Sequence, residues 1–315
     1  MASPALTPYP HGRVSNLTST DGTIRMSNPQ GEIVDLSAQG GVNSLIGYTT
    51  PTNTALGVGA GTSVTSGTAN TALGVNTLHA NNTGQWNTAV GDIALAANTT
   101  GYENTAIGIG ALTANTTGHD NTAIGALTLA ANTTGLYNNA VGESALTANT
   151  TGVSNCAIGH LALAANTIGA YNVAFGEGAL SPNTTGINNS ALGAYALGTN
   201  TTGQNNTAIG LSALVVNTTG GGNTAVGDNA LATNTTQHNA VGLGTNTVAT
   251  ADGAVAIGTD NTGAGATTAV ANEIALGTAL HTTKLLGTPA FVAGDQYLVI
   301  DAAGHIHKSG LGPVS

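Results

Sequence analysis

A 17-residue repeat dominates the chain and constrains its fold more than any other feature. The motif Asn-Thr-Ala-Ile-Gly, or a close variant, ends at eleven equally spaced glycines, which begin with Gly57, Gly74 and Gly91 and continue to Gly227. Later matches end at Gly242, Gly258 and Gly277, where the spacing drifts. Each full repeat continues with Leu four residues after the glycine and Asn seven residues after it, usually followed by Thr-Thr-Gly. A fixed internal period of this kind is the signature of a repeat architecture.

The length and composition of the repeat predict an all-β fold, a parallel β-solenoid with one 17-residue coil per repeat. A unit this short cannot hold the two helices of a helical repeat, and the regularly placed glycines interrupt any long helix. Short strands around Asn-Thr-Ala-Ile and Ala-Leu are expected to pair with the same segments of the next coil. The glycines would turn the chain between them.

Stacked coils place identical side chains above one another, about 4.8 Å apart. An Asn amide can both donate to and accept from the amide of the next coil, so Asn favours such stacking. We therefore predict two structural Asn ladders. They include Asn87, Asn104 and Asn121 before the first segment of the repeat, and Asn98, Asn115 and Asn132 after the second.

The residue types of one repeat indicate assembly with further copies. Along the first segment, Thr105 and Ile107 would face one side of a strand, whereas Asn104 and Ala106 would face the other. Each coil offers two large apolar residues, such as Ile107 and Leu112, which is little for a self-sufficient core. We expect one side of the strand to close the coil and the other to pack against neighbouring chains.

Charge and hydropathy exclude several classes of partner. The chain has 4 Lys and Arg residues against 14 Asp and Glu residues, a net charge of −10, and the four cations lie outside the repeats. No basic groove for nucleic acid is therefore expected. No apolar run approaches the roughly 20 residues of a membrane span, and the first residues do not resemble a signal peptide, so neither membrane insertion nor the usual export route is expected.

The sequence indicates no enzyme and no cofactor. The eight His residues and the acids of the repeats are interpreted as scattered, without a carboxylate pair. Cys156 fills a slot that Thr holds in most repeats, so it is interpreted as a small Thr substitute. His305 and His307 would lie on one side of a strand and are candidate ligands of a transition metal, with a plain surface hairpin as the alternative.

Four aromatic residues occupy the two variable positions that precede the first Asn of a repeat. These are Trp86, Tyr102, Tyr137 and Tyr171. Variable positions are expected on the outside, where an aromatic ring offers an apolar face to a sugar. The four residues are candidate contacts to a cell-surface glycan or protein, and chance decoration is the alternative.

The ends of the chain differ from the repeats. Residues 19–37 predict a β-hairpin with strands around residues 24–26 and 33–36 and a turn at residues 28–31. Residues 297–307 again predict strand, turn and strand. We divide the chain into an N-terminal attachment segment (1–50), a solenoid shaft (51–280) and a C-terminal β cap (281–315).

The repeats Asn-Thr-Ala-Val-Gly, Asn-Thr-Ala-Ile-Gly and Asn-Asn-Ala-Val-Gly resemble the head repeats of YadA-like trimeric autotransporter adhesins. That resemblance implies a left-handed β-roll and a homotrimer. The segment 19–37 resembles N-terminal segments of phage tail-fibre proteins, which implies binding to a baseplate or another tail protein. The segment 297–307 is similar to the stretch before an endosialidase-type intramolecular chaperone, which implies that Ser315 is a processed end.

Together these features predict a trimeric fibre or tail spike that attaches a virion or a phage-tail-like particle to a cell surface. Two alternatives remain open at this point. One is a secreted adhesin of the trimeric autotransporter type. The other is an ice-binding β-solenoid, because regular Thr arrays on a flat solenoid can match a lattice.

Overall fold

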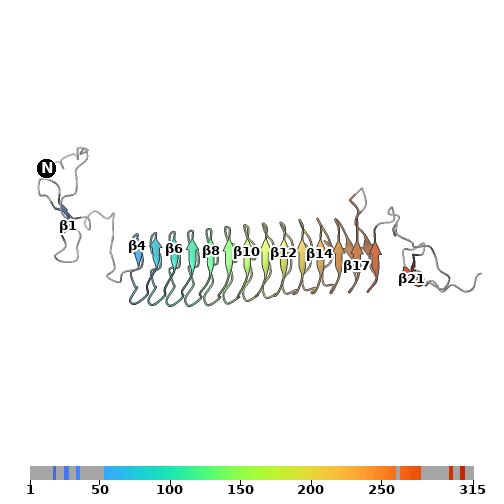
Figure 1. Cartoon of the computed structure of the whole chain (residues 1–315), viewed down its shortest axis with the longest axis horizontal. Helices are drawn as coiled ribbons and strands as arrows, with labels where there is room; N and C mark the ends of the chain where they lie inside the picture. Colours follow the sequence, from blue (N-terminus) through green and yellow to red (C-terminus); the bar gives the residue numbers. More distant parts are fainter. Residues whose placement is uncertain are drawn as a thin grey trace, which may run out of the picture.

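The computed structural model describes residues 53–259 and 263–277, and the backbone of five short strands nearer the ends of the chain. The described residues from 53 to 259 and from 263 to 277 wind into a stack of coils, and one three-residue strand from each coil joins a 14-stranded parallel sheet (Figure 1). At about 4.8 Å per strand, the 13 intervals of this sheet give a length of about 62 Å. The predicted all-β parallel β-solenoid with 17-residue coils is confirmed.

The strands of this sheet share one position in each coil. They are β4 Thr54–Leu56, β5 Thr71–Leu73, β6 Thr88–Val90, β7 Thr105–Ile107, β8 Thr122–Ile124, β9 Asn139–Val141, β10 Cys156–Ile158, β11 Val173–Phe175, β12 Ser190–Leu192, β13 Thr207–Ile209, β14 Thr224–Val226, β15 Val241–Leu243, β17 Val255–Ile257 and β19 Ile274–Leu276. Between β7 and β8 the register aligns Ala106 with Ala123 and Ile107 with Ile124. Equivalent residues of successive repeats are therefore direct neighbours.

The second segment of the repeat is not a strand, contrary to our prediction. In each regular coil the Leu of this segment lies in a run of turns with a left-handed backbone, for example Leu112 at φ +51°. Such a backbone costs an L-residue roughly 1–2 kcal/mol, whereas full burial of a Leu side chain contributes about 1.5–3 kcal/mol. Leu112 is completely buried, and its N–H still donates to the carbonyl of Thr128 in the next coil at 3.0 Å. Burial thus outweighs the backbone cost.

The turn after each strand depends on glycine. Gly108 has φ +135°, and a Cβ atom there would lie 2.4 Å from the carbonyl oxygen of Gly125. The same geometry recurs at the other turn glycines because their main chains stack directly on one another. Only a residue without a side chain meets both requirements.

The regular period extends one coil further than the motif suggested. We expected Gly242 to end a repeat, but it lies opposite Ala225, in the strand position that Ala holds elsewhere. Gly244 makes the turn instead, with φ +127°. The following pairs depart from the period, since Leu243 to Ile257 is a shorter step along the chain and Ile257 to Leu276 a longer one. Here the two short strands β16 Val248–Ala249 and β18 Thr267–Thr268 form a second parallel pair.

The core of each coil contains one large apolar side chain rather than two. Leu112, Ala106 and Ala111 are completely buried, as are Asn104 and Asn115. Ile107, which alternates with Ala106 along the strand, points outward and is 39% exposed. The small side of the strand therefore closes the coil, and the Thr and aliphatic side faces outward.

Antiparallel strands occur on both sides of the solenoid in the sequence. Near the N-terminus, β2 Arg25–Ser27 pairs with β3 Ile33–Asp35, which confirms the predicted hairpin, and β1 Leu17–Thr18 adds a third strand that the sequence did not suggest. Near the C-terminus, β20 Leu298–Ile300 pairs with β21 Ile306–Lys308, as predicted.

Candidate functional site

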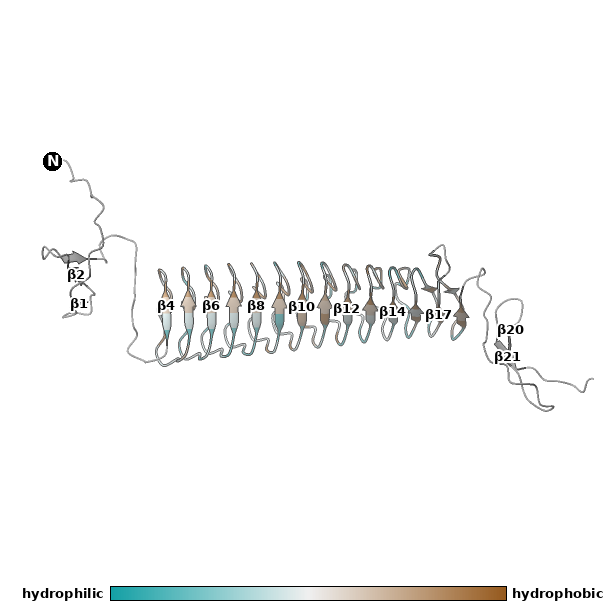
Figure 2. Cartoon of the chain, turned by 45° about the horizontal axis from the view of Figure 1, so that its top comes forward, coloured by the Kyte–Doolittle hydropathy of each residue, from teal (hydrophilic) through white to brown (hydrophobic). Residues whose placement is uncertain are grey.

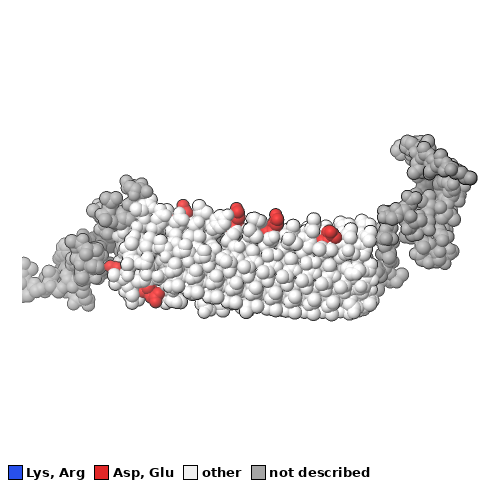
Figure 3. Space-filling model, turned by 180° about the vertical axis from the view of Figure 1, so that it is seen from behind, with Lys and Arg blue, Asp and Glu red and all other residues white. Residues whose placement is uncertain are grey.

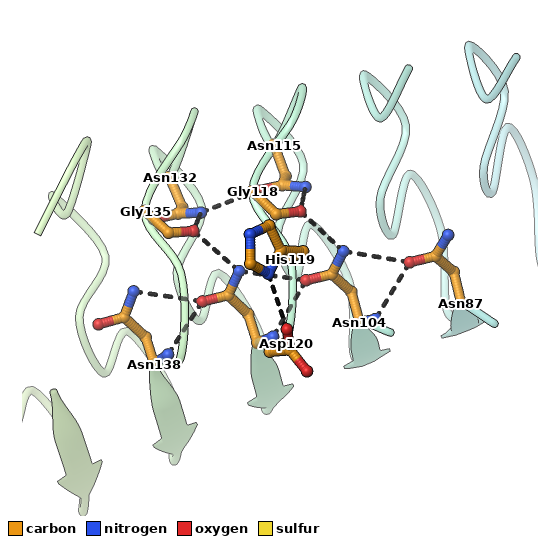
Figure 4. A network of polar contacts seen from close by, with 10 residues as sticks. Asn87, Asn104, Asn115, Gly118, His119, Asp120, Asn132, Gly135 and Asn138 are labelled. Atoms are coloured by element: carbon orange, nitrogen blue, oxygen red, sulfur yellow. Dashed lines mark hydrogen bonds and ion pairs between the residues drawn. The ribbon is translucent and has the colours of Figure 1, made fainter. Parts of the chain in front are cut away.

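The first Asn of each repeat forms a continuous chain of hydrogen bonds just before the sheet, which we call the strand ladder (Figure 4). The Oδ1 of Asn104 accepts from the main-chain N–H and from the Nδ2 of Asn121, both at 3.1 Å. The same Nδ2 donates to the carbonyl of Gly135 at 2.9 Å. Asn87, Asn104 and Asn121 are at most 1% exposed, so these bonds satisfy polar groups that water cannot reach.

The second Asn of each repeat forms a parallel chain, the turn ladder. The Nδ2 of Asn115 donates to the Oδ1 of Asn98 at 2.8 Å and to the carbonyl of Gly118 at 3.0 Å, and Asn132 repeats the pattern on Asn115. All three Asn side chains are completely buried. The carbonyl of Gly118 also accepts from the Nδ2 of Asn104, a member of the strand ladder, at 2.9 Å. The glycine of the Thr-Thr-Gly-x-x turn is therefore hydrogen-bonded to both ladders.

The turn ladder ends at Asn234. This side chain is completely buried, yet neither its Nδ2 nor its Oδ1 has a hydrogen-bond partner, and the Oδ1 of Asn217 also lacks one. In other coils a Gly carbonyl accepts from the ladder amide, but here Gln237 occupies that glycine position, and its Oε1 accepts instead from Thr235 N–H at 2.8 Å. The loss of the glycine coincides with the end of the regular stacking.

Apolar side chains directly before the turn glycines form a row along the outward side of the sheet, which we call the aliphatic row. Ten of its fourteen members are 37–44% exposed. The row consists of Leu56, Leu73, Val90, Ile107, Ile124, Val141, Ile158, Phe175, Leu192, Ile209, Val226, Leu243, Ile257 and Leu276. In Figure 2 the brown colours gather toward the arrow ends of the strands. The chain alone leaves this row in contact with water.

Three of the aromatic residues singled out from the sequence lie in four successive coils, at the opposite end of the strands. Tyr102 stacks on His119 with ring centroids 4.5 Å apart, and His119 meets Tyr137 edge-on at 5.5 Å. Trp86 precedes Glu103, Asp120 and Tyr137 in one row of equivalent positions. Trp86, Tyr102 and Tyr137 are 56%, 38% and 52% exposed. Tyr171 is exposed two coils beyond Tyr137 and does not belong to this group.

Two carboxylates lie among these rings. The Nδ1 of His119 is 2.7 Å from the Oδ2 of Asp120 (Figure 4). A hydrogen bond to Asp120, together with the removal of water and the negative charge of Asp120, raises the pKa of Glu103 above its ordinary value. We call the six residues Trp86, Tyr102, Glu103, His119, Asp120 and Tyr137 the aromatic corner. The sequence interpretation missed its polar members, although their shared distance from the strand-ladder Asn was the available signal.

The other acids of the regular coils also follow the repeat, so our interpretation of them as scattered was wrong. Asp92, Glu143, Glu177 and Asp228 each directly follow a turn glycine. Equivalent positions of stacked coils form a row along the shaft, and Figure 3 shows red carboxylate side chains along one edge of it, with no Lys or Arg visible on that face. The four acids are two or three coils apart, about 10–14 Å, which is too far for direct contact. The hydroxyl of Tyr195 donates to Glu177 at 2.9 Å, which raises the pKa of Tyr195.

The remaining candidate residues are the metal ligands, Cys156 and Ser315. Among the described residues, no group of three or more His, Cys, Asp or Glu side chains is placed to hold a metal ion. Cys156 lies in β10 at the Thr position, and partial burial raises the pKa of its thiol. His307 lies in β21, where only the backbone is described, while His305 and Ser315 lie outside the described residues. In the part of the chain described, no helix is long and apolar enough to cross a bilayer.

Comparison with known proteins gives no assignment. No protein-family model matches this chain, and no curated protein and no solved structure is significantly similar to it.

Proposed function

We propose that this chain is the shaft of a trimeric fibre that attaches a virion or a phage-tail-like particle to a cell surface. The aliphatic row is the observation that supports this most directly. A continuous line of exposed apolar side chains along a whole sheet is unusual for a monomer and typical of an interaction surface. Assembly of copies of the same chain would cover the row over its full length.

The number of three chains and the left-handed sense of the coil come from the resemblance to YadA-like head repeats. An arrangement of the chains around a common axis suits the geometry of the sheet. The outward side of each strand is narrow and presents the same two residue types in most coils. Under this proposal the N-terminal segment binds a baseplate or another tail protein. Trp86, Tyr102, Tyr137 and Tyr171 are candidate contacts with the receptor.

Light scattering after size exclusion tests the assembly. We expect a mass of three times 30.5 kDa for the full chain. Replacing Ile107, Ile124 and Ile158 together by Asn should dissociate the assembly, because each change puts a polar amide into the apolar row. Ile168→Asn is a matched control, since Ile168 is also exposed but lies in the Thr-Thr-Gly turn. A wild-type mass of 30.5 kDa would contradict the proposed trimer.

An ice-binding solenoid is the second candidate, favoured by the row of Thr side chains beside the aliphatic row. This row includes Thr88, Thr105 and Thr122, but four successive coils replace Thr by other residues, namely Asn139, Cys156, Val173 and Ser190. The break interrupts any lattice match in the middle of the shaft. A monomer that shows thermal hysteresis would favour this candidate over the fibre.

A further inference from the structure

We propose that the aromatic corner is a binding site for an uncharged saccharide. This inference rests on the proposed role in surface attachment and specifies both the site and the class of ligand. It concerns six residues in four coils, from Trp86 to Tyr137.

The rings of the corner are presented as binding surfaces rather than buried in a core. Trp86 and Tyr137 are more than half exposed at the two ends of one row, three coils or about 14 Å apart. Tyr102 lies parallel to His119, with an angle of 8° between the rings, and Tyr137 stands at 90° to His119. The corner therefore offers ring faces in two orientations over a length that suits several linked sugar rings. Aromatic rings of this kind combine an apolar face with a polar edge.

The corner is also fixed in place by the main chain. The N–H of Asp120 donates to the carbonyl of Tyr102 at 3.1 Å, and the N–H of Tyr137 donates to that of His119 at 3.2 Å. Trp86, Glu103, Asp120 and Tyr137 all have left-handed φ angles between +54° and +59°. Because the regular coils repeat this backbone, the side chains project from a preformed surface and little ordering is needed on binding.

The charges of the corner decide between classes of ligand. Residues 53–277 contain no Lys or Arg, so the described shaft has no permanently charged cation to pair with a sialate, uronate, sulfate or phosphate. Glu103 and Asp120 would repel such groups. Of the two carboxyl groups, that of Asp120 is engaged with the Nδ1 of His119 at 2.7 Å. Their remaining lone pairs can accept from sugar hydroxyls.

A printed array of neutral and acidic oligosaccharides, probed with the full-length chain, tests the site. We expect binding to one or more neutral glycans and none to sialylated, sulfated or uronate-bearing glycans. Trp86→Ala and Tyr137→Ala should each weaken binding by about tenfold or more, as expected for central aromatic contacts. Asn188→Ala and Asn205→Ala should leave binding unchanged, because these residues hold the same left-handed position in coils away from the corner.

Several outcomes would overturn the site. These are preferential binding to acidic glycans, no binding to any neutral glycan, or equal loss of binding in the Asn188 and Asn205 controls. Binding of a fluorescent oligolysine that requires Trp86 and Tyr137, without binding of any sugar, would instead assign the corner to a cationic peptide.

Adhesion of the full chain to a panel of bacterial cells distinguishes a failure of the saccharide site from a failure of the proposed attachment function. Persistent adhesion of Trp86→Ala would support the attachment function and contradict the saccharide site at the aromatic corner. Absence of adhesion by the wild type would contradict the proposed attachment function itself.

Discussion

The Oδ1 of Asn104 accepts two hydrogen bonds from one residue, Asn121, through its main-chain N–H and its side-chain Nδ2. This relationship recurs along the shaft and couples each coil to the next through the backbone and the core at once. A single Asn thus aligns the start of a strand and closes the turn before it. The ladder belongs to the interior, so its effect on stability should be large.

We expect Asn121→Leu to lower the stability of the shaft. The change removes the Nδ2 that donates to Asn104 Oδ1 and to Gly135 O, and the Oδ1 that accepts from both donors of Asn138. The main-chain N–H of Asn138 loses its partner, inside the buried core of a coil. Each buried group left unsatisfied costs about 1–3 kcal/mol. Thermal unfolding followed by circular dichroism, together with hydrogen exchange at neighbouring coils, measures the effect.

Asn234→Leu, at the end of the turn ladder, is the control for replacing a buried Asn whose side chain makes no hydrogen bond. Asn234 is equally buried but makes no hydrogen bond through its side chain, so its replacement removes no partner. We expect a neutral or slightly stabilising change, because an unpaired amide is replaced by an apolar group. A destabilisation by Asn234→Leu as large as that of Asn121→Leu would contradict the role assigned to the ladder bonds.

Gly125→Ala should destabilise the turn strongly. Gly125 has φ +133°, and an added Cβ would lie 2.7 Å from the carbonyl carbon and oxygen of Gly142. Backbone strain of this type costs about 1–3 kcal/mol before the clash is counted. Gly110→Ala is the comparison, because Leu127 holds the equivalent position at φ +56° and the nearest atom to the new Cβ is a flexible side-chain carbon. Similar melting temperatures for the two variants would be inconsistent with direct stacking of the glycines.

The carboxyl pair of the aromatic corner predicts a pH dependence. The pKa of Glu103 is raised in the folded chain above its ordinary value of 4.5, so the folded state binds more protons than the unfolded state just above that pH. The contribution of Glu103 to stability is therefore fully present below about pH 4.5 and is lost as pH rises through its folded pKa. Comparing melting temperatures of wild type and Glu103→Gln from pH 4 to pH 7 should show a smaller decline in the variant. The effect should be small, because Glu103 lies at the surface.

The thiol of Cys156 provides a probe of the outward side of the sheet. Cys156 and Ile158 both project outward from β10, so an assembly that covers the aliphatic row should also slow alkylation of the thiol. We expect iodoacetamide to react faster with Cys156 when Ile107 and Ile124 are replaced by Asn than in the wild type. Equal rates at equal pH would argue against burial of this side between chains.

The period of the repeat was enough to predict the solenoid, because stacking requires only that equivalent residues recur at a constant interval. It could not locate the last regular turn. The residues Asn239-Ala240-Val241-Gly242 match the motif, yet Ala240 takes the place of the ladder Asn, and its N–H donates to Asn223 Oδ1 at 2.9 Å. The register is set by hydrogen bonds to the preceding coil, and these favour the turn at Gly244 over the local match.

The candidate site was predictable in part. The exposure of Trp86, Tyr102 and Tyr137 follows from their variable positions, and Tyr102 and His119 share one offset from the ladder Asn. The orientations of the rings depend on side-chain packing, which the spacing of residues in the sequence does not determine. The outward direction of Ile107 was likewise left open, because alternation along a strand separates two sides without saying which one encloses the core.

The in-register stacking of identical coils also has a consequence for how such a protein changes over generations. An in-frame loss of one repeat would join Asn104 to Thr122, or an equivalent pair, and a duplication would insert a further coil, in either case without altering the type of any local contact. Length would then vary in whole steps of about 4.8 Å, independently of the residues at either end. The reach of the molecule is a discrete inherited trait that recombination between its own repeats can adjust.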